Sequence, residues 1–170
     1  MKIKTHNAFG IGILSVLGMF LTAPLNALIS AAILTVLTNQ LIDGLGHAKN
    51  AQGYPVRTPF THTIFRSIFW GLAPAILLFL IFNSLRHTQV FHITGYPYWI
   101  LIQGALAGPL HMFLDAITEG GIFRKVNGKF KRFALFHIRY DNPMWNMFFQ
   151  FIGIILIGIF FYWGYFKGKI

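Results

Sequence analysis

The sequence predicts an all-α fold, a polytopic membrane helical bundle with about five transmembrane helices. Of its 170 residues, 55% are hydrophobic and 17% are aromatic, and the mean hydropathy is +0.60. Only 11% of residues are charged, well below the roughly 25% that is typical of soluble domains. The apolar residues fall into stretches of about the length that crosses a bilayer, ~20 residues. We expect one integral membrane domain that spans residues 1–170.

The first apolar stretch, residues 8–42, carries no Asp, Glu, Lys or Arg and is too long for one membrane helix. Pro24 offers a break, because proline disfavours a helical conformation in the residue before it. We therefore predict two helices, over 7–22 and 25–43, joined as a hairpin.

Three more helices are predicted after a Gly-rich and Pro-rich polar loop over 44–61. They span 62–85, 98–119 and 144–166, with Pro74 tolerated in the first and Pro109 expected to kink the second. The segment 120–143, between the fourth and fifth helices, is the most basic part of the chain. It should be a basic loop or a small hairpin, because Asn127-Gly128 favours a tight turn with positive φ.

The net charge of +10 is explained by membrane orientation. If residues 8–42 are a hairpin, the N-terminus and the two loops 44–61 and 120–143 lie on one side. With Arg66, which flanks the first loop, they hold eleven of the fourteen Lys and Arg residues. The positive-inside rule then predicts a multi-pass protein of the plasma membrane with a cytoplasmic N-terminus. His87 and His92 would lie on the opposite side. Tyr162, Trp163, Tyr165 and the closing lysines would form an interfacial anchor.

Membrane lipids are the expected partners, since basic loops also attract anionic headgroups. No nucleic acid is expected, because the basic residues flank apolar helices and the aromatic residues appear in those same apolar stretches. The oligomeric state stays open.

The chain has only four carboxylates, and three of them lie near histidines at the ends of apolar stretches; the four are Asp43, Asp115, Glu119 and Asp141. Ionisable groups near membrane-embedded sequence are costly to desolvate, so we treat them as functional candidates. There is no cysteine, so a metal would take nitrogen and oxygen ligands, which favours zinc, manganese or iron.

His111 and Asp115 lie four residues apart on a predicted helix and therefore share one face. Thr118 and Glu119 should continue that face one turn further on. Such a pair can supply one nitrogen and one oxygen ligand, although a packed polar pair at a helix end has the same pattern. Asp43 ends a predicted helix, where the helix dipole disfavours an acid, and a bound cation would compensate.

Two further segments offer candidates. Thr61 could cap the third helix, which would place His62 in its first turn on the side of Asp43 and His111. In an extended strand over 136–143, His137, Arg139 and Asp141 would share one face, either as a salt-bridged surface or as a substrate contact. Arg57 and Arg139 could each clamp a phosphate with a planar guanidinium.

These motifs resemble the YdjM-like family of predicted membrane-bound metal-dependent hydrolases over residues 5 to about 122. The carriers are Thr5-His6, Leu41-Ile42-Asp43, Phe60-Thr61-His62-Thr63, His111 to Thr118, and Gly120-Gly121-Ile122. The segment Leu135 to Asp141 is similar to an archaeal branch of related proteins. The ligand order is also similar to that of zinc-dependent phospholipase C, a helical phosphoesterase.

The resemblance implies one metal held by Asp43, His62, His111 and Asp115, with His6 helping to bind a second ion bridged by Asp115. Two departures from the family patterns matter. Asp43-Gly44-Leu45-Gly46-His47 stands where the family has Asp-x-Asp-His, and the second His-x-x-x-Glu of the phospholipase has no counterpart. One or two Zn²⁺ ions, or Mn²⁺, therefore stay open, and a three-metal site is not expected.

The function expected from sequence is a membrane-embedded metal-dependent hydrolase of a phosphate ester, such as a phospholipid or a lipid-linked phosphate. Glu119 is the candidate second ligand or general base, and Arg57 or Arg139 would stabilise developing negative charge. The alternative is a non-enzymatic scaffold or transport subunit with a structural metal or a polar helix-end network. Transport is less favoured, because its ionisable groups should lie near the bilayer midplane.

Overall fold

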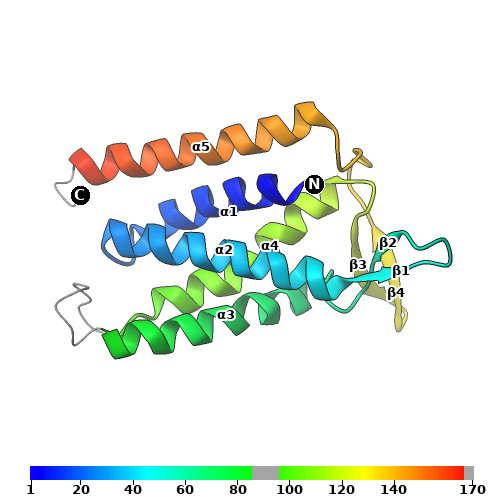
Figure 1. Cartoon of the computed structure of the whole chain (residues 1–170), viewed down its shortest axis with the longest axis horizontal. Coiled ribbons are helices and arrows are strands. Elements are labelled where there is room, and N and C mark those ends of the chain that lie inside the picture. The colour runs from blue at the N-terminus through cyan, green and yellow to red at the C-terminus, as the bar shows by residue number, and fades with distance from the viewer. Residues whose placement is uncertain (86–95, 167–170) are drawn as a thin grey trace.

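The computed structural model describes residues 1–85 and 96–166, in which five helices form a bundle capped at one end by two small β-hairpins (Figure 1). The helices are α1 (Ile3–Gly18), α2 (Pro24–Gly46), α3 (Ile64–Leu85), α4 (Trp99–Ile117) and α5 (Pro143–Phe166). The strands are β1 (His47–Lys49), β2 (Pro55–Arg57), β3 (Ile122–Val126) and β4 (Lys129–Phe133). The predicted bundle of five helices is therefore confirmed for the described residues.

The two hairpins differ in how well the sequence predicted them. The β3–β4 hairpin turns at Asn127 and Gly128, whose φ angles are 50° and 78°, as the Asn-Gly pair indicated. The β1–β2 hairpin pairs His47 with Arg57 inside the segment that we expected to be an irregular loop. Three-residue strands leave little periodicity to detect in a sequence.

Four of the helices in the described part of the chain are long and apolar enough to cross a membrane: α2, α3, α4 and α5. Helix α1 has 16 residues, about 24 Å at ~1.5 Å per residue, which is shorter than a hydrocarbon core of ~30 Å. It begins at Ile3 rather than at residue 7, because its first turn is bonded to α5: Thr5 Oγ1 donates to Asn146 Oδ1 at 2.6 Å. The prediction of five membrane-spanning helices is thus supported for four.

Small residues allow the helices to approach closely. A Cβ atom on Gly71 of α3 would overlap the carbonyl oxygen of Gly104 on α4, and one on Gly108 would overlap the carbonyl oxygen of Ser67. The pairs Ser67/Gly71 and Gly104/Gly108 therefore form a small-xxx-small contact of the kind that joins membrane helices. This contact brings the start of α3 against the middle of α4.

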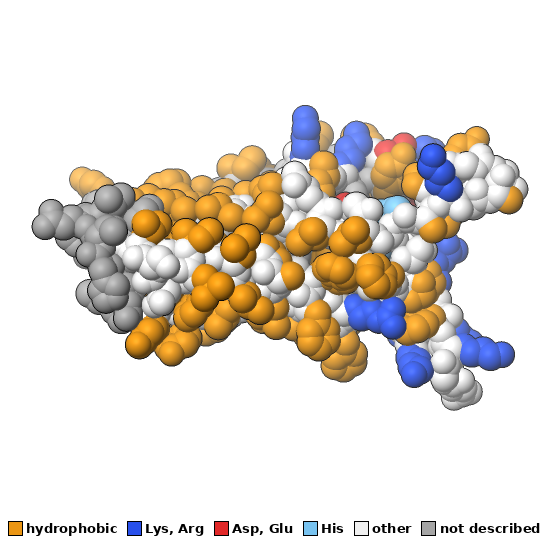
Figure 2. Space-filling model, turned by 60° about the horizontal axis from the view of Figure 1, so that its bottom comes forward, with side chains coloured by type: hydrophobic (Ala, Val, Ile, Leu, Met, Phe, Trp, Pro, Cys, Tyr) orange, Lys and Arg blue, Asp and Glu red, His pale blue; other side chains and the backbone are white. Residues whose placement is uncertain are grey.

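The basic residues gather at one end of the bundle. The N-terminus, both hairpins, the start of α3 and the connection from β4 to α5 lie at the same end (Figure 1). The eleven Lys and Arg residues of the described chain belong to these segments. Figure 2 shows blue basic side chains at this end and apolar side chains along the helices. The predicted topology of the first two helices as a hairpin is therefore correct. His87, His92 and the closing lysines lie outside the described residues.

Candidate metal centre

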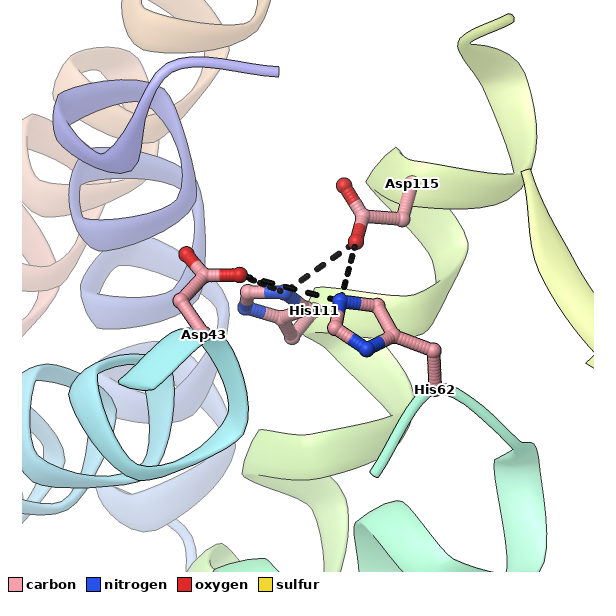
Figure 3. A group of neighbouring side chains, drawn as sticks. All are labelled: Asp43, His62, His111 and Asp115. Carbon is pink, nitrogen blue, oxygen red and sulfur yellow. Dashed lines mark ion pairs between the residues drawn. The ribbon is translucent and has the colours of Figure 1, made fainter. Parts of the chain in front are cut away.

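Four ionisable side chains converge at the basic end of the bundle (Figure 3). Asp43 comes from the last turn of α2, His62 from the loop before α3, and His111 and Asp115 from one face of α4. One ligand atom from each lies within 4.8 Å of all the others, so the group could hold a metal ion. They are four of the five ligands predicted from sequence.

The spacing of these atoms matches the requirements of one ion. His111 Nε2 lies 3.2 Å from Asp115 Oδ2 and 3.5 Å from Asp43 Oδ1. His62 Nε2 lies 3.6 Å and 3.7 Å from the same two oxygens. Metal–ligand bonds of ~2.0–2.1 Å in a tetrahedron place neighbouring ligand atoms roughly 3.3–3.4 Å apart. These four donor–donor distances lie close to this value and all pairs lie within 4.8 Å, so the group could hold a small divalent cation.

Unpaired polar atoms point to the same conclusion. His62 Nε2, His111 Nε2 and Asp115 Oδ2 are buried and make no hydrogen bond. A buried polar atom without a partner costs about 1–3 kcal/mol, and more when it is charged. These three atoms face one another without forming hydrogen bonds, whereas a cation between them would give each atom a partner.

Hydrogen bonds behind the imidazoles fix which nitrogen faces the centre. Thr61 Oγ1 donates to the carbonyl oxygen of Ile42 at 2.9 Å, so it accepts from His62 Nδ1 at 2.8 Å. Asn39 Oδ1 accepts from His111 Nδ1 at 2.9 Å, while Asn39 Nδ2 donates to Asn7 Oδ1 at 2.8 Å. Both imidazoles therefore present the lone pair of Nε2 inward, as metal-binding histidines do.

The sequence did not single out Asn7 and Asn39, and it gave Thr61 a different role. Asn39 stands four residues before Asp43 on α2, and that helical spacing was the available signal. Thr61 does not cap α3, which corrects the prediction. The cap is Thr63, whose Oγ1 accepts from the backbone N–H of Arg66 at 3.2 Å, and the helix begins at Ile64.

Glycine at position 46 is required for the approach of α2 to His62. A Cβ atom there would overlap Thr61 Oγ1 and lie 2.6 Å from both Cε1 and Nδ1 of His62. The next residue, His47, donates from Nδ1 to the carbonyl oxygen of Asp43 at 2.7 Å, and its ring meets that of His62 edge-on. The end of α2 thus packs directly against one of the candidate ligands.

The second oxygen of Asp115 faces away from this centre toward three nitrogen atoms. Arg57 Nη2 lies 2.6 Å from Oδ1, His6 Nε2 lies 3.2 Å away, and the Met1 backbone nitrogen lies 3.3 Å away. Arg57 Nη1 also donates to Thr118 Oγ1 and to the carbonyl oxygen of Gly121, at 3.2 and 2.9 Å. Arg57, predicted to clamp a phosphate, instead holds Asp115.

His6, the fifth predicted ligand, lies beside the group of four. Its ring stacks on that of His111 with centroids 4.0 Å apart, and its Nε2 faces Asp115 Oδ1.

His62 has a pKa below the ordinary value of 6.5, chiefly because burial disfavours its charged form. The imidazole of His62 is therefore neutral near pH 7 and can bind a metal.

A pocket of about 540 Å³ opens beside the centre, between the hairpins and the helix ends. Asp43 is about 35% exposed and forms part of its wall. The charged or titratable side chains around the pocket are Asp43, His47, Arg57, Glu119 and Arg132, and the aromatic ones are Tyr54, Phe123 and Tyr140. Arg132, a basic residue of the segment 120–143, thus lies on the pocket wall.

The remaining predicted site residues, Glu119 and Arg139, lie on the pocket wall and outside the pocket, respectively. Helix α4 ends at Ile117 and Thr118 is extended, with ψ of 163°, so the helical face does not continue to Glu119 as predicted. Glu119 is exposed and lines the pocket instead. Arg139 is 75% exposed and forms a bidentate pair with Asp141 at 3.0 and 3.2 Å, without lining this pocket.

The strand predicted over 136–143 is largely absent. Only Ile138 forms a bridge, to Thr118, and His137 has a φ of 54°. A left-handed residue breaks the alternation of side chains, so His137, Arg139 and Asp141 do not share the face of a strand. Neither His137 nor Asp141 belongs to the group of four.

Fold and site together define a class: a helical protein with four potential membrane spans and a buried His/Asp group that could bind a metal ion. The chain belongs to the family described as "Protein of unknown function (DUF1286)", whose profile matches residues 1–114. The match includes Asp43, His62 and His111 and ends one residue before Asp115. No curated protein and no solved structure matches the chain.

Proposed function

We propose that this protein is a membrane-embedded metal-dependent hydrolase of a phosphate ester, with a phospholipid or lipid-linked phosphate as substrate. The observation that carries the proposal is the junction of the metal centre with the pocket. Asp43 belongs to both, since its Oδ1 faces His62 and His111 while its side chain forms part of the pocket wall. A metal held there is reached by a substrate that enters the pocket.

The donor set favours Zn²⁺, with Mn²⁺ as the second choice, because two imidazoles and two carboxylates suit borderline divalent ions. Such an ion, when bound, polarises a phosphoryl oxygen and lowers the pKa of its bound water to ~7. Asp43, His62, His111 and Asp115 would hold it. Thr61 and Asn39 would keep the two imidazoles in the orientation that binding needs.

The pocket supplies groups for an anionic substrate. Arg57 donates to Asp115, Thr118 and Gly121, and Arg139 pairs with Asp141 outside the pocket lining. We therefore assign contact with the phosphate to Arg132, which pairs with Phe123 across the β3–β4 hairpin on the pocket side. Glu119, on the same wall, is the candidate general base.

A lipid substrate fits the position of the pocket. It lies where the polar hairpins meet helices whose large apolar side chains are exposed, among them Phe65 and Phe69 on α3. A headgroup could enter the pocket while acyl chains stay along the helices. The gathering of basic residues at this end favours the cytoplasmic face of the plasma membrane, by the positive-inside rule.

A structural metal site is the second candidate, and one observation favours it. Four protein donors are already enough to saturate a tetrahedral zinc ion, as in structural sites. The two functions differ in whether the ion accepts an external ligand. A catalytic ion must bind a phosphate analogue or water at the side of Asp43, whereas a saturated structural ion does not.

The test is a purified full-length chain in detergent, loaded with zinc or manganese and assayed on soluble and lipid phosphate esters. We expect metal-dependent hydrolysis that is lost in Asp115→Asn and kept in Asp141→Asn, a matched change at an exposed carboxylate. Bound metal without hydrolysis or phosphate-analogue binding would favour the structural site. A protein that binds no metal would refute both candidates.

A further inference from the structure

We infer that the centre is mononuclear, and that the guanidinium of Arg57 takes the place of the second cation that Asp115 would otherwise bridge. The inference rests on the proposed metal centre and concerns its nuclearity. It distinguishes two functions for the two oxygens of one carboxylate. Asp115 Oδ2 faces His62 and His111 and has no hydrogen-bond partner, whereas Oδ1 faces only nitrogen atoms.

A carboxylate that bridges two metals must offer a lone pair of each oxygen to an ion. Asp115 Oδ1 is engaged by Arg57 Nη2 at 2.6 Å, and the Met1 backbone nitrogen approaches it to 3.3 Å. Guanidinium remains protonated in proteins and has no lone pair to share with a metal. The position on the Oδ1 side is thus held by a fixed positive charge, which would also repel a second divalent ion.

Arg57 is held firmly in that position. Its two terminal nitrogens donate to Asp115, Thr118 and Gly121, and its side chain is only 13% exposed. A Cβ atom on Gly120 would come within 2.5 Å of Arg57 Nη1, so a side chain there would displace the guanidinium from its present position. Because β2 ends at Arg57 and α4 ends beside Thr118, the contact also joins the first hairpin to the helix that carries two ligands.

His6 completes the same arrangement as a hydrogen-bond donor. Its Nε2 lies 3.2 Å from Asp115 Oδ1, while its Nδ1 is buried without a partner. A proton on Nε2 suits this geometry, because it is shared with a carboxylate and the unpaired nitrogen then carries only a lone pair. With Nε2 protonated and the ring stacked on His111, His6 supports the ligands rather than binding an ion.

Residues 1–85 and 96–166 contain no second group of clustered metal ligands. The one group of three or more potential ligands there is the group of four, and Glu119 and Asp141 are not part of it. A second ion on the Oδ1 side of Asp115 would lie beside His6 and would face the charge of Arg57. The arrangement therefore predicts about one bound ion per chain and a positioning role for both Arg57 and His6.

The experiment is the metal content of the detergent-purified full chain, measured by elemental analysis after saturation with Zn²⁺ and removal of free ion. We expect about one zinc per chain in the wild type, and the same in His6→Phe, which keeps a ring against His111 but has no nitrogen. About two per chain in the wild type would overturn the inference while leaving the metal centre intact, and a fall from two to one in His6→Phe would identify His6 as a ligand of the second ion.

A measurement on the unmodified protein gives an independent result. Loaded with Mn²⁺, a mononuclear centre gives the electron paramagnetic resonance spectrum of an isolated ion, whereas a bridged pair gives an exchange-coupled spectrum. The first outcome supports the inference and the second overturns it. Absence of bound metal in every preparation would instead refute the metal centre on which the inference rests, so the two failures are distinguishable.

Discussion

Asn39 Oδ1 accepts a hydrogen bond from His111 Nδ1 at 2.9 Å, and this bond directs the opposite nitrogen of the imidazole toward Asp115. An amide on α2 thus sets the tautomer of a histidine on α4. Metal ligands commonly depend on such a partner, and its removal typically costs 10–100-fold in metal affinity. Substitution of the buried polar residues around the centre should therefore change metal affinity, as substitution of the ligands should.

Replacing Asn39 with leucine should weaken metal binding by about 10–100-fold without removing a ligand. The leucine cannot accept from His111 Nδ1, so the imidazole loses the bond that orients it. Competition with a chromophoric zinc chelator measures the affinity. Gln103→Leu is the matched control. Gln103 lies on α4 and is a buried amide like Asn39, but it bonds to Leu14, Ala27 and Ser30 and not to a candidate ligand. Equal affinities in the two variants would contradict the prediction.

Gly46→Ala should displace His62 and destabilise the fold by about 1–3 kcal/mol, because the new methyl group overlaps Thr61 and crowds the His62 ring. Metal content should fall in parallel. The control is Gly44→Ala on the same helix, where a Cβ atom meets nothing within 4 Å. That change should be neutral or stabilising by up to about 1 kcal/mol, since alanine favours helix. Thermal unfolding in detergent, with and without zinc, compares the two, and a Gly46 variant as stable as the Gly44 one would refute the packing.

Metal retention should decrease as the solution is acidified. Burial lowers the pKa of His62 from 6.5, so its neutral form persists at pH 7 and loses its lone pair only under more acidic conditions. As the pH falls, His62 of the unfolded chain is protonated first, near pH ~6.5. Burial of the neutral imidazole therefore costs no stability above that pH, and the folded state loses stability relative to the unfolded state as the pH falls below it. Metal content after equilibration between about pH 8 and 4 tests this; retention that increases toward acid would contradict it.

Arg132→Met should reduce phosphoester hydrolysis by about 10²-fold while leaving metal content unchanged, if Arg132 contacts the phosphate in the pocket. Arg124→Met is the control, since Arg124 lies on the other face of the hairpin, over the ring of Phe133, and is not part of the pocket wall. Turnover of the metal-loaded variants on one substrate compares them. Equal loss in both would point to a general effect of hairpin charge.

Much of the architecture could be predicted from sequence because it depends on local rules. Long apolar stretches specify helices, Pro24 opens α2, and Asn127-Gly128 turns the β3–β4 hairpin. The four-residue spacing of His111 and Asp115 places them on one helix face, and helical geometry alone guarantees this. The side of the bundle that carries the candidate site also followed from charge and topology.

The tertiary structure decided what each oxygen and nitrogen faces. Asp115 Oδ2 faces two histidines and Oδ1 faces Arg57 because α2, α4 and the first hairpin meet there. That meeting depends on close helix contacts at glycines and on a β1–β2 hairpin too short to leave a pattern. The sequence alone determined which residue types were available for a metal centre. Long-range packing, which no local spacing encodes, determined that Arg57 holds Asp115 and that Glu119 lies outside the group of four.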